Sequence, residues 1–292
     1  MTIFRTISIL IIGLILSVPL AQAEDLKPVL GQTVLKVCAD GYNLPYSNKE
    51  LEGFDNKIAA LLSEELGIPL EYYWFPQRIG FSRNTIKKVN QETGRFLCDV
   101  AMSVPEHTDF LKPTKSYWSS IEAMVYRSGE GYELKTLADI AKVSKSGKQL
   151  RIGIFDRGVT TKPLLDLGLA DQIHYFQMMS GDTRVNAGRI VKDALAQGEV
   201  DVVLLWGPIA SYYASISDVP MVVQPLNELG EAFIFSFSMA TRYQDKTWNA
   251  LLNKFIDKRR DDINAIIAEY YFPSLADVNP YPKKRAPKDD DD

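Results

Sequence analysis

Short runs of β-branched and aliphatic residues alternate with amphipathic helical segments along most of this chain. The clearest helix is predicted at 55–66, where Ile58, Leu62 and Leu66 share one face and Gly67 ends the helix. Repeated strand, helix, strand order predicts parallel sheets with helices on both faces. The segments expected to be strands are 34–39, 70–74, 99–103, 150–155, 200–205 and 219–223.

The strand and helix pattern restarts after residue 155, which indicates two sheets rather than one. A chain of this length is sufficient for two lobes of roughly 100 to 150 residues each. We therefore predict a bilobal α/β fold, with two mainly parallel sheets and a cleft between the lobes. A helix pair at 244–270 follows both sheets. The expected limits are 24–126 with 230–280 for the first lobe, 127–229 for the second lobe, and crossovers at 124–131 and 222–233.

The N-terminus has the layout of a secretory signal peptide. Arg5 precedes an apolar run at 7–18, and the small-residue site AQA ends at Ala23. That run is shorter than the roughly 20 apolar residues that span a bilayer. We expect residues 1–23 to be removed and the exported protein to have no membrane span. At the other end, the charged tail 281–292 is expected to be disordered.

Charge and cysteine content restrict the partners and the compartment. The chain has 33 basic and 37 acidic residues, so its net charge of -4 argues against a nucleic-acid partner. Its two cysteines, Cys38 and Cys98, are expected to form a disulfide because exported proteins fold in an oxidising compartment. Two buried free thiols are the alternative.

Candidate binding residues follow the expected strands. Ligands of open parallel sheets meet the loops at the carboxyl ends of the strands, so the loop 40–48 is expected to form one lip of the cleft. Ser103 ends another strand at the same edge, and Trp118 and Trp206 are expected near the cleft. The residues of the loop 40–48 and of the loop after the strand 70–74 that we consider candidates are Asp40, Tyr42, Asn43, Tyr46, Gln77 and Arg78.

Large aromatic side chains and an arginine within this set have two interpretations. Core packing explains most buried aromatics. Tyr46, Arg78 and Trp118 also have the amphipathic character of residues that anchor protein interfaces.

Two sets of motifs carry a resemblance to known families. The segments "PYSNKELEGFDNKIAALL", "CDVAMSVPEHTDF", "KQLRIGIFDRGVTT" and "VKDALAQGEVDVVLLWG" resemble type II periplasmic solute-binding proteins over nearly the whole mature chain. More narrowly, "VCAD", "GFDNKIA", "WFPQRIGFSRNT" and "CDVAMSVPE" are similar to the MxaJ/XoxJ proteins, periplasmic accessory components encoded with PQQ-dependent methanol dehydrogenases. The resemblance implies a periplasmic location and a PQQ-dependent methanol dehydrogenase as partner.

The chain departs from the amino-acid binders of this fold at both charged clamps. His107 stands where those proteins place an arginine for the ligand carboxylate, and imidazole cannot form the bidentate pair that guanidinium gives. Trp206 and Gly207 stand where an aspartate would hold the ligand ammonium. We therefore expect no tight binding of free amino acids.

Two further ligand classes depend on polar residues. Thr160 and Thr161 lie between a strand and a helix, where they would either bind an anion or, as is more usual, cap the helix. A lanthanide or calcium chaperone would require Asp40, Asp55 and Asp99 to converge, although Asp55 is expected at the start of a helix.

Enzymatic motifs do not occur in the sequence. His107 and His174 lie in separate segments with no cysteine or second histidine at metal-ligand spacing, and His174 is expected to be a structural residue of a strand. The chain has no G-x-S-x-G elbow, no G-x-G-x-x-G after a strand and no P-loop. We therefore predict no catalytic residues, no cofactor and no metal.

Two functions remain. The first is an accessory protein that binds a methanol dehydrogenase or assists its maturation. The second is the substrate-binding protein of an ABC transporter for a small ligand other than an amino acid. An aromatic or filled cleft favours the first, and convergent polar groups favour the second.

Overall fold

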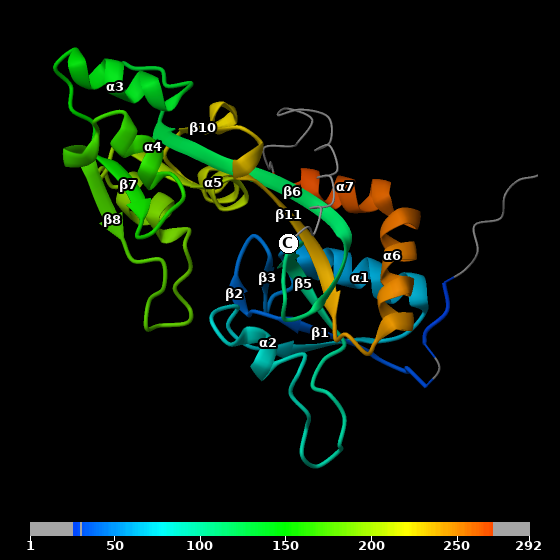
Figure 1. Cartoon of the computed structure of the whole chain (residues 1–292). Helices are drawn as coiled ribbons and strands as arrows, with labels where there is room; N and C mark the ends of the chain where they lie inside the picture. The colour runs from blue at the N-terminus through cyan, green and yellow to red at the C-terminus, as the bar shows by residue number, and fades with distance from the viewer. Residues whose placement is uncertain (1–25, 30, 271–292) are drawn as a thin grey trace, which may run out of the picture.

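The computed structural model describes residues 26–270 apart from residue 30 (Figure 1). The predicted signal peptide and the charged tail 281–292 lie outside the described residues. Within these, nine strands form one mixed sheet in the order β4-β1-β5-β11-β6-β9-β7-β8, and β10 pairs with β6. The bounds of these strands are β1 (Leu35–Ala39), β4 (Leu70–Trp74), β5 (Val100–Pro105), β6 (Lys112–Arg127), β7 (Ile152–Phe155), β8 (Ile173–Phe176), β9 (Val202–Trp206), β10 (Met221–Pro225) and β11 (Ile234–Thr241).

Helices cover the sheet on both faces. The α-helices are α1 (Phe54–Leu66), α2 (Phe81–Asn84), α3 (Leu137–Lys145), α4 (Thr161–Asp166), α5 (Gly207–Ser215), α6 (Lys246–Lys258) and α7 (Arg260–Ala268). Shorter turns are η1 (Ala170–Gln172), the π-helix η2 (Ile190–Leu195), η3 (Asn227–Leu229) and η4 (Glu231–Phe233). We call β1, β4, β5 and β11 with α1, α6 and α7 the first lobe, and β7 to β10 with α3 to α5 the second lobe (Figure 1).

The strand β6 belongs to both lobes. Its residues up to Ile121 pair with β11, and its residues from Glu122 onward pair with β9. Met124, predicted to begin a crossover, therefore lies inside a strand, and the two predicted sheets are continuous through β6 and contain antiparallel pairs. The bilobal α/β class is confirmed, whereas the lobe limits near residues 126 and 229 stay a prediction.

The six predicted strands and the helix at 55–66 are present to within a few residues. Gly67 ends α1 with a φ of 63°, the left-handed conformation that favours glycine. The predicted pair at 244–270 forms α6 and α7. His174 lies in β8 as expected, but its side chain is exposed.

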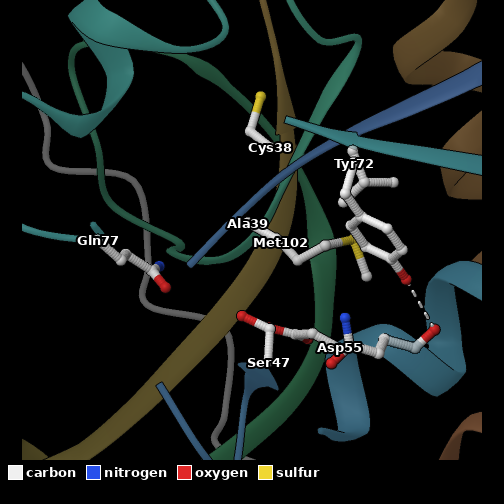
Figure 2. A pocket seen from close by; sticks show the side chains of 9 residues that line it. Cys38, Ala39, Ser47, Asp55, Tyr72, Gln77 and Met102 are labelled. Carbon is white, nitrogen blue, oxygen red and sulfur yellow. Dashed lines mark hydrogen bonds between the residues drawn. The ribbon is translucent and has the colours of Figure 1, made fainter. Parts of the chain in front are cut away.

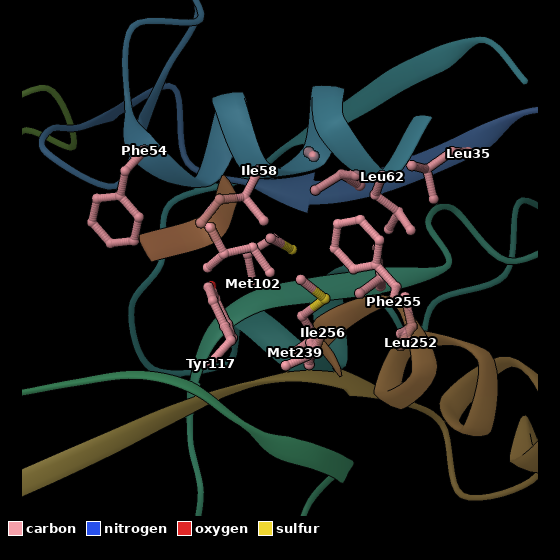
Figure 3. Packing of buried hydrophobic residues seen from close by; sticks show 14 of the residues in the cluster. Leu35, Phe54, Ile58, Leu62, Met102, Tyr117, Met239, Leu252, Phe255 and Ile256 are labelled. Carbon is pink, nitrogen blue, oxygen red and sulfur yellow. The ribbon is translucent and has the colours of Figure 1, made fainter. Parts of the chain in front are cut away.

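The core of the first lobe lies between α1, the sheet and α6. Phe54, Ile58 and Leu62 of α1 face Met102, and Phe255 of α6 closes the cluster (Figure 3). All but Met102 are fully buried. This packing fixes the amino end of α1, which lies close to the junction between the lobes.

The core of the second lobe has two faces. Alternation along β9 sends Val202 and Leu204 to one face, and Val203 and Leu205 to the other. Strand β7 contributes Ile152 and Ile154 to the first of these faces. The second lobe is thus a sheet covered on both sides, as its nearly continuous apolar strands predict.

The predicted disulfide is confirmed. Cys38 and Cys98 are bonded with a Cα to Cα distance of 5.5 Å, and the bond ties β1 to the segment before β5. Among the helices within residues 26–270, none combines the length and the apolar character needed to cross a bilayer.

Candidate functional site

The loop 40–48 forms a hairpin of β2 (Tyr42–Asn43) and β3 (Ser47–Asn48) that is fixed by Asp40. The Asp40 carboxylate accepts hydrogen bonds from the N–H of Tyr42 at 3.0 Å and of Gln77 at 2.7 Å. The Asn43 side-chain amide also donates to the side-chain oxygen of Gln77 at 3.1 Å. The structure brings Asp40, Asn43 and Gln77 together, and they hold two loops in place at the end of β1.

A small cavity lies beneath this hairpin (Figure 2). Its lining includes Ser47, Asp55, Tyr72 and Gln77, and its volume is about 10 Å³. This space admits about one water molecule, so the cavity cannot hold an amino acid or a larger solute.

A buried hydrogen-bond network extends from Asp55 toward the junction. The Tyr117 hydroxyl donates to the Asp55 carboxylate at 2.6 Å and accepts from the N–H of Ser103 at 3.0 Å. The Trp118 indole N–H then donates to the Ser103 hydroxyl at 3.1 Å. Burial raises the pKa of Asp55 to about 7. Ser103, predicted as a ligand residue, is committed to this internal network.

Six aromatic rings occupy the junction where β6 passes from its pairing with β11 to its pairing with β9. We call this set the aromatic cluster. Trp118 stacks on Phe237 with centroids 4.3 Å apart, and Trp206 contacts Phe237 at 5.7 Å. Tyr46 is 5.9 Å from Trp118. The cluster comprises Tyr46, Phe54, Trp118, Trp206, Phe235 and Phe237.

Burial in the aromatic cluster changes the roles expected for Tyr46 and Trp118. Both side chains are buried, and burial raises the pKa of Tyr46 far above its usual value. The Trp206 indole N–H lies near the Tyr46 hydroxyl and partly offsets the rise in the pKa of Tyr46. Even so, this nitrogen makes no hydrogen bond of acceptable geometry to any described residue. Tyr46 and Trp118 are packing residues in this closed arrangement, and they are not exposed anchors.

Glu122 is a functional candidate that the sequence interpretation missed. It lies on β6 opposite Trp206 of β9, at the point where β6 changes lobes. Burial raises the pKa of Glu122 to about 7. A charged residue in the middle of the run "SSIEAMVYR" was the available signal, because a carboxylate within a strand of apolar residues faces a desolvated environment.

Arg78 connects the two lobes. Its guanidinium donates to the carbonyl oxygens of Asp182 at 3.1 Å and Val185 at 3.2 Å, and also to that of Ser180. The Asn186 side chain adds a bond of 3.4 Å to the Tyr42 carbonyl. Arg78 and Tyr42 thus lie at the contact between the two lobes, and the guanidinium fastens the loop after β8 to the first lobe.

The remaining candidates lie apart from this junction. His107 is exposed, in the loop after β5. Thr160 is buried and begins α4 without a side-chain capping bond, so the expected cap is absent. The Thr161 hydroxyl is also buried and has no hydrogen-bond partner among the described residues.

The three carboxylates of the metal-chaperone alternative have different partners. Asp40 holds the hairpin, Asp55 accepts from Tyr117, and Asp99 accepts from the N–H of Lys36 at 3.0 Å. No group of three or more potential metal ligands occurs within the part of the chain that the structure describes. The chaperone alternative therefore gains no support.

The fold consists of two α/β lobes joined through the long strand β6. This is the architecture of a type II periplasmic binding protein. The solved periplasmic binding protein XoxJ from Methylobacterium extorquens AM1 is 33% identical, with a TM-score of 0.67 over 82% of this chain and 99% of that chain. MxaJ from Methlophaga aminisulfidivorans MPT shares the fold, with 23% identity and a TM-score of 0.65 over 82% of this chain and 100% of that chain.

Sequence comparison gives the same relationship. The protein MoxJ of Methylorubrum extorquens AM1 is 22% identical over 268 residues, which cover 87% of this chain and 85% of that protein. No family model matches the chain. The chain belongs to the MxaJ/XoxJ family of periplasmic binding proteins, and it is a binding protein associated with methanol oxidation.

Proposed function

We propose that this protein is a periplasmic accessory protein that binds a PQQ-dependent methanol dehydrogenase or assists its maturation. The scaffold is that of a solute-binding protein, used here to hold a protein partner. Its periplasmic location is supported by the predicted signal peptide, by the disulfide between Cys38 and Cys98, and by the XoxJ relative, which is itself a periplasmic binding protein.

The aromatic cluster is the observation that supports this proposal most. A binder of amino acids needs an arginine and an aspartate directed at the ligand between its lobes. Here His107 is exposed in a loop, while Trp206 packs against Trp118 at 6.2 Å and Phe235 at 5.6 Å. The rings of the protein itself line the junction, and the ionisable residue opposite Trp206 is Glu122, which offers no cation to a ligand carboxylate.

The structure changes our view of which residues would contact the partner. Tyr46 and Trp118, predicted as anchors with Arg78, are buried, and replacing them by alanine would unfold the first lobe before it tested binding. Arg78 is occupied by the carbonyl groups of the second lobe. In the proposed function, Arg78 contributes to docking by holding the lobes together.

The substrate-binding protein of a transporter is the second candidate, and the fold is the observation in its favour. The small volume beneath the hairpin weakens it, whereas the uncapped start of α4 at Thr160 is a second point in its favour, because an N–H group that no side chain caps is available to an anion. A transporter protein would bind a small molecule that survives purification and is released on denaturation.

Affinity purification from periplasm separates these two functions. The tagged chain is expected to retain the methanol dehydrogenase at a stoichiometric level, identified by mass spectrometry, and deletion of its gene should lower the yield of active dehydrogenase. A tagged Tyr243→Asp protein, altered at an exposed turn, serves as the control. Recovery of a transporter subunit together with a bound small molecule, without the dehydrogenase, would contradict the proposal.

A further inference from the structure

Four exposed apolar side chains lie where the two lobes meet. The exposed fraction is 90% for Ile79, 50% for Met178, 46% for Met179 and 42% for Tyr42. We call these four residues the apolar rim. Side chains of this size are seldom exposed together on an isolated surface, and such groups mark interaction sites.

The three segments that carry the apolar rim are bonded to one another. Arg78, next to Ile79, donates to the carbonyl of Ser180, which follows Met179. Asn186 of the same loop donates to the carbonyl of Tyr42. In Figure 1 the loop after β8 descends from the second lobe toward β2 and α2. The rim therefore consists of residues of both lobes, and Arg78 keeps its two halves in register.

The loop of the second lobe is itself well fixed. The Asp156 carboxylate accepts the N–H of Met178 at 3.0 Å, and Arg189 donates to the carbonyl of Gln177 at 2.8 Å. The Asn186 side chain donates to the Tyr213 hydroxyl at 2.6 Å. These contacts hold the methionines outward in a defined position, which reduces the entropy lost when a partner binds.

Positive charge surrounds the apolar rim. Basic residues outnumber acidic ones at the rim, although the whole chain has a net charge of -4. The segments 76–84 and 177–189 carry four arginines and one aspartate, Asp182, which pairs with Arg184. Lys49 lies over the Tyr42 ring at 5.4 Å, and the other carboxylates at the rim, Asp40 and Asp156, accept the N–H groups of Tyr42 and Met178. The arginines are Arg78, Arg83, Arg184 and Arg189. A local positive field on an acidic protein favours an acidic partner surface.

The charge distribution also disfavours two other occupants. A second copy of the chain would bring the same arginines together across a two-fold axis, and like charges would repel. An anionic membrane would attract the rim but repel the net negative charge of the rest of the protein. A folded protein with a local acidic patch meets neither difficulty.

We propose that the apolar rim is a docking site for an acidic protein surface that presents an exposed apolar side chain, and that the site is complete only while Arg78 joins the lobes. This inference rests on the proposed function, in which the partner is the methanol dehydrogenase. The inference assigns the docking surface to both lobes. The interface candidates from the sequence, Tyr46, Arg78 and Trp118, all fall within the predicted first lobe.

Biolayer interferometry with purified PQQ-dependent methanol dehydrogenase tests the site. Ile79→Asp, Met179→Asp and Arg184→Glu are each expected to weaken binding about tenfold or more, because truncation or charge reversal at an interface anchor has effects of this size. Binding of the unaltered protein should weaken as salt is added. Tyr243→Asp, at the exposed turn before α6, and Lys254→Glu, at an exposed position of α6, are the matched apolar and charge controls and should bind normally.

The possible results separate the site from the function. Normal binding by all three rim variants would overturn the docking site and leave the proposed function standing. No binding by the unaltered protein would overturn both. The rim variants could instead bind the dehydrogenase normally but lose binding to phosphatidylglycerol vesicles, which would assign the rim to a membrane. They could also bind the dehydrogenase normally but lose self-association in sedimentation velocity, which would assign the rim to a second copy. Either result would overturn the inference.

Discussion

The two lobes differ in how their polar groups are satisfied. In the first lobe, Asp55, Ser103 and Tyr117 form a closed network beside a helix whose start is fixed by Asn56. In the second lobe, the Asp201 carboxylate pairs with the half-exposed Arg151, and the Thr161 hydroxyl is buried without a partner in the described structure. The first lobe is thus the one that holds a titratable carboxyl group inside a buried network.

This difference gives the lobes different mechanical roles. The second lobe is connected to the first by β6 and β11, and its loop after β8 is held at the cleft edge chiefly by Arg78. Hydrogen bonds to carbonyl groups of a loop exchange readily with water, whereas a buried network does not. We interpret the first lobe as the rigid part of the molecule. The second lobe is the part that can move away from it when the Arg78 bonds break.

The largest expected effect comes from removing the disulfide. Replacing Cys38 and Cys98 by serine opens a loop with a sequence separation of 60 residues, which corresponds to a loss of about 4 kcal/mol in unfolding free energy. Hydrogen exchange resolved by segment should show the loss in the first lobe. Equal loss of protection in β7 and β9 would contradict the separation of the lobes.

A methyl group added at Gly53 is expected to cost about 3 kcal/mol. It would lie 2.1 Å from the carbonyl oxygen of Tyr46, which is backbone and cannot rotate away. At Gly188 of the second lobe the added group would lie 2.0 Å from the ring of Tyr213, which is buried and bonded to Asn186. A ring can still shift more than backbone can, so we expect a somewhat smaller loss. Urea unfolding of the two alanine variants measures both; a larger loss at Gly188 would reverse the comparison.

Stability should fall as pH rises from about 4 to about 7. The pKa values of Asp55 and Glu122 are raised from 3.8 and 4.5 to about 7, so the folded protein binds more protons than the unfolded chain across this window. Stabilisation by these groups is complete below pH 4 and lost by pH 7, and we expect a total change of about 2 kcal/mol after relaxation of the site.

Thermal unfolding of the Asp55→Asn and Glu122→Gln variants at several pH values checks this assignment. Each variant should have a flatter dependence on pH than the unaltered protein, because an amide does not titrate. Asp201→Asn is the control: Asp201 is largely buried, which alone would raise its pKa, but its pairing with Arg151 and Arg127 lowers the pKa overall, so its removal should not flatten the fall in stability between pH 4 and 7. An unchanged slope in both test variants would show that other groups titrate.

The smallest effect on stability is expected for Arg78→Ala. The variant loses three bonds to carbonyl groups at a partly exposed site, which amounts to about 1 kcal/mol in total once water replaces them. Faster hydrogen exchange in 180–186 and a larger radius of gyration should accompany it. An unchanged exchange rate in 180–186 and an unchanged radius of gyration would mean that the lobes stay closed without the arginine.

Local patterns in the sequence were sufficient for much of the fold. Alternation and helical periodicity located six strands and α1, and Gly67 marked the end of that helix. The long strand β6 was missed because its two halves pair with different lobes, so neither half shows the burial pattern of one sheet.

The hydrogen-bonded contacts of the site were not predictable from pattern. Asp55 meets Tyr117 across 62 residues, and Arg78 meets Ser180 across 102.

Parallel calorimetric titrations test the central claim, which is that the aromatic junction serves a protein partner and not a small zwitterion. The unaltered protein is titrated with purified PQQ-dependent methanol dehydrogenase and, separately, with a panel of amino acids that includes glutamate and arginine. We predict saturable binding of the dehydrogenase and no micromolar binding of any amino acid. Micromolar binding of one amino acid, with no heat from the dehydrogenase, would contradict the account.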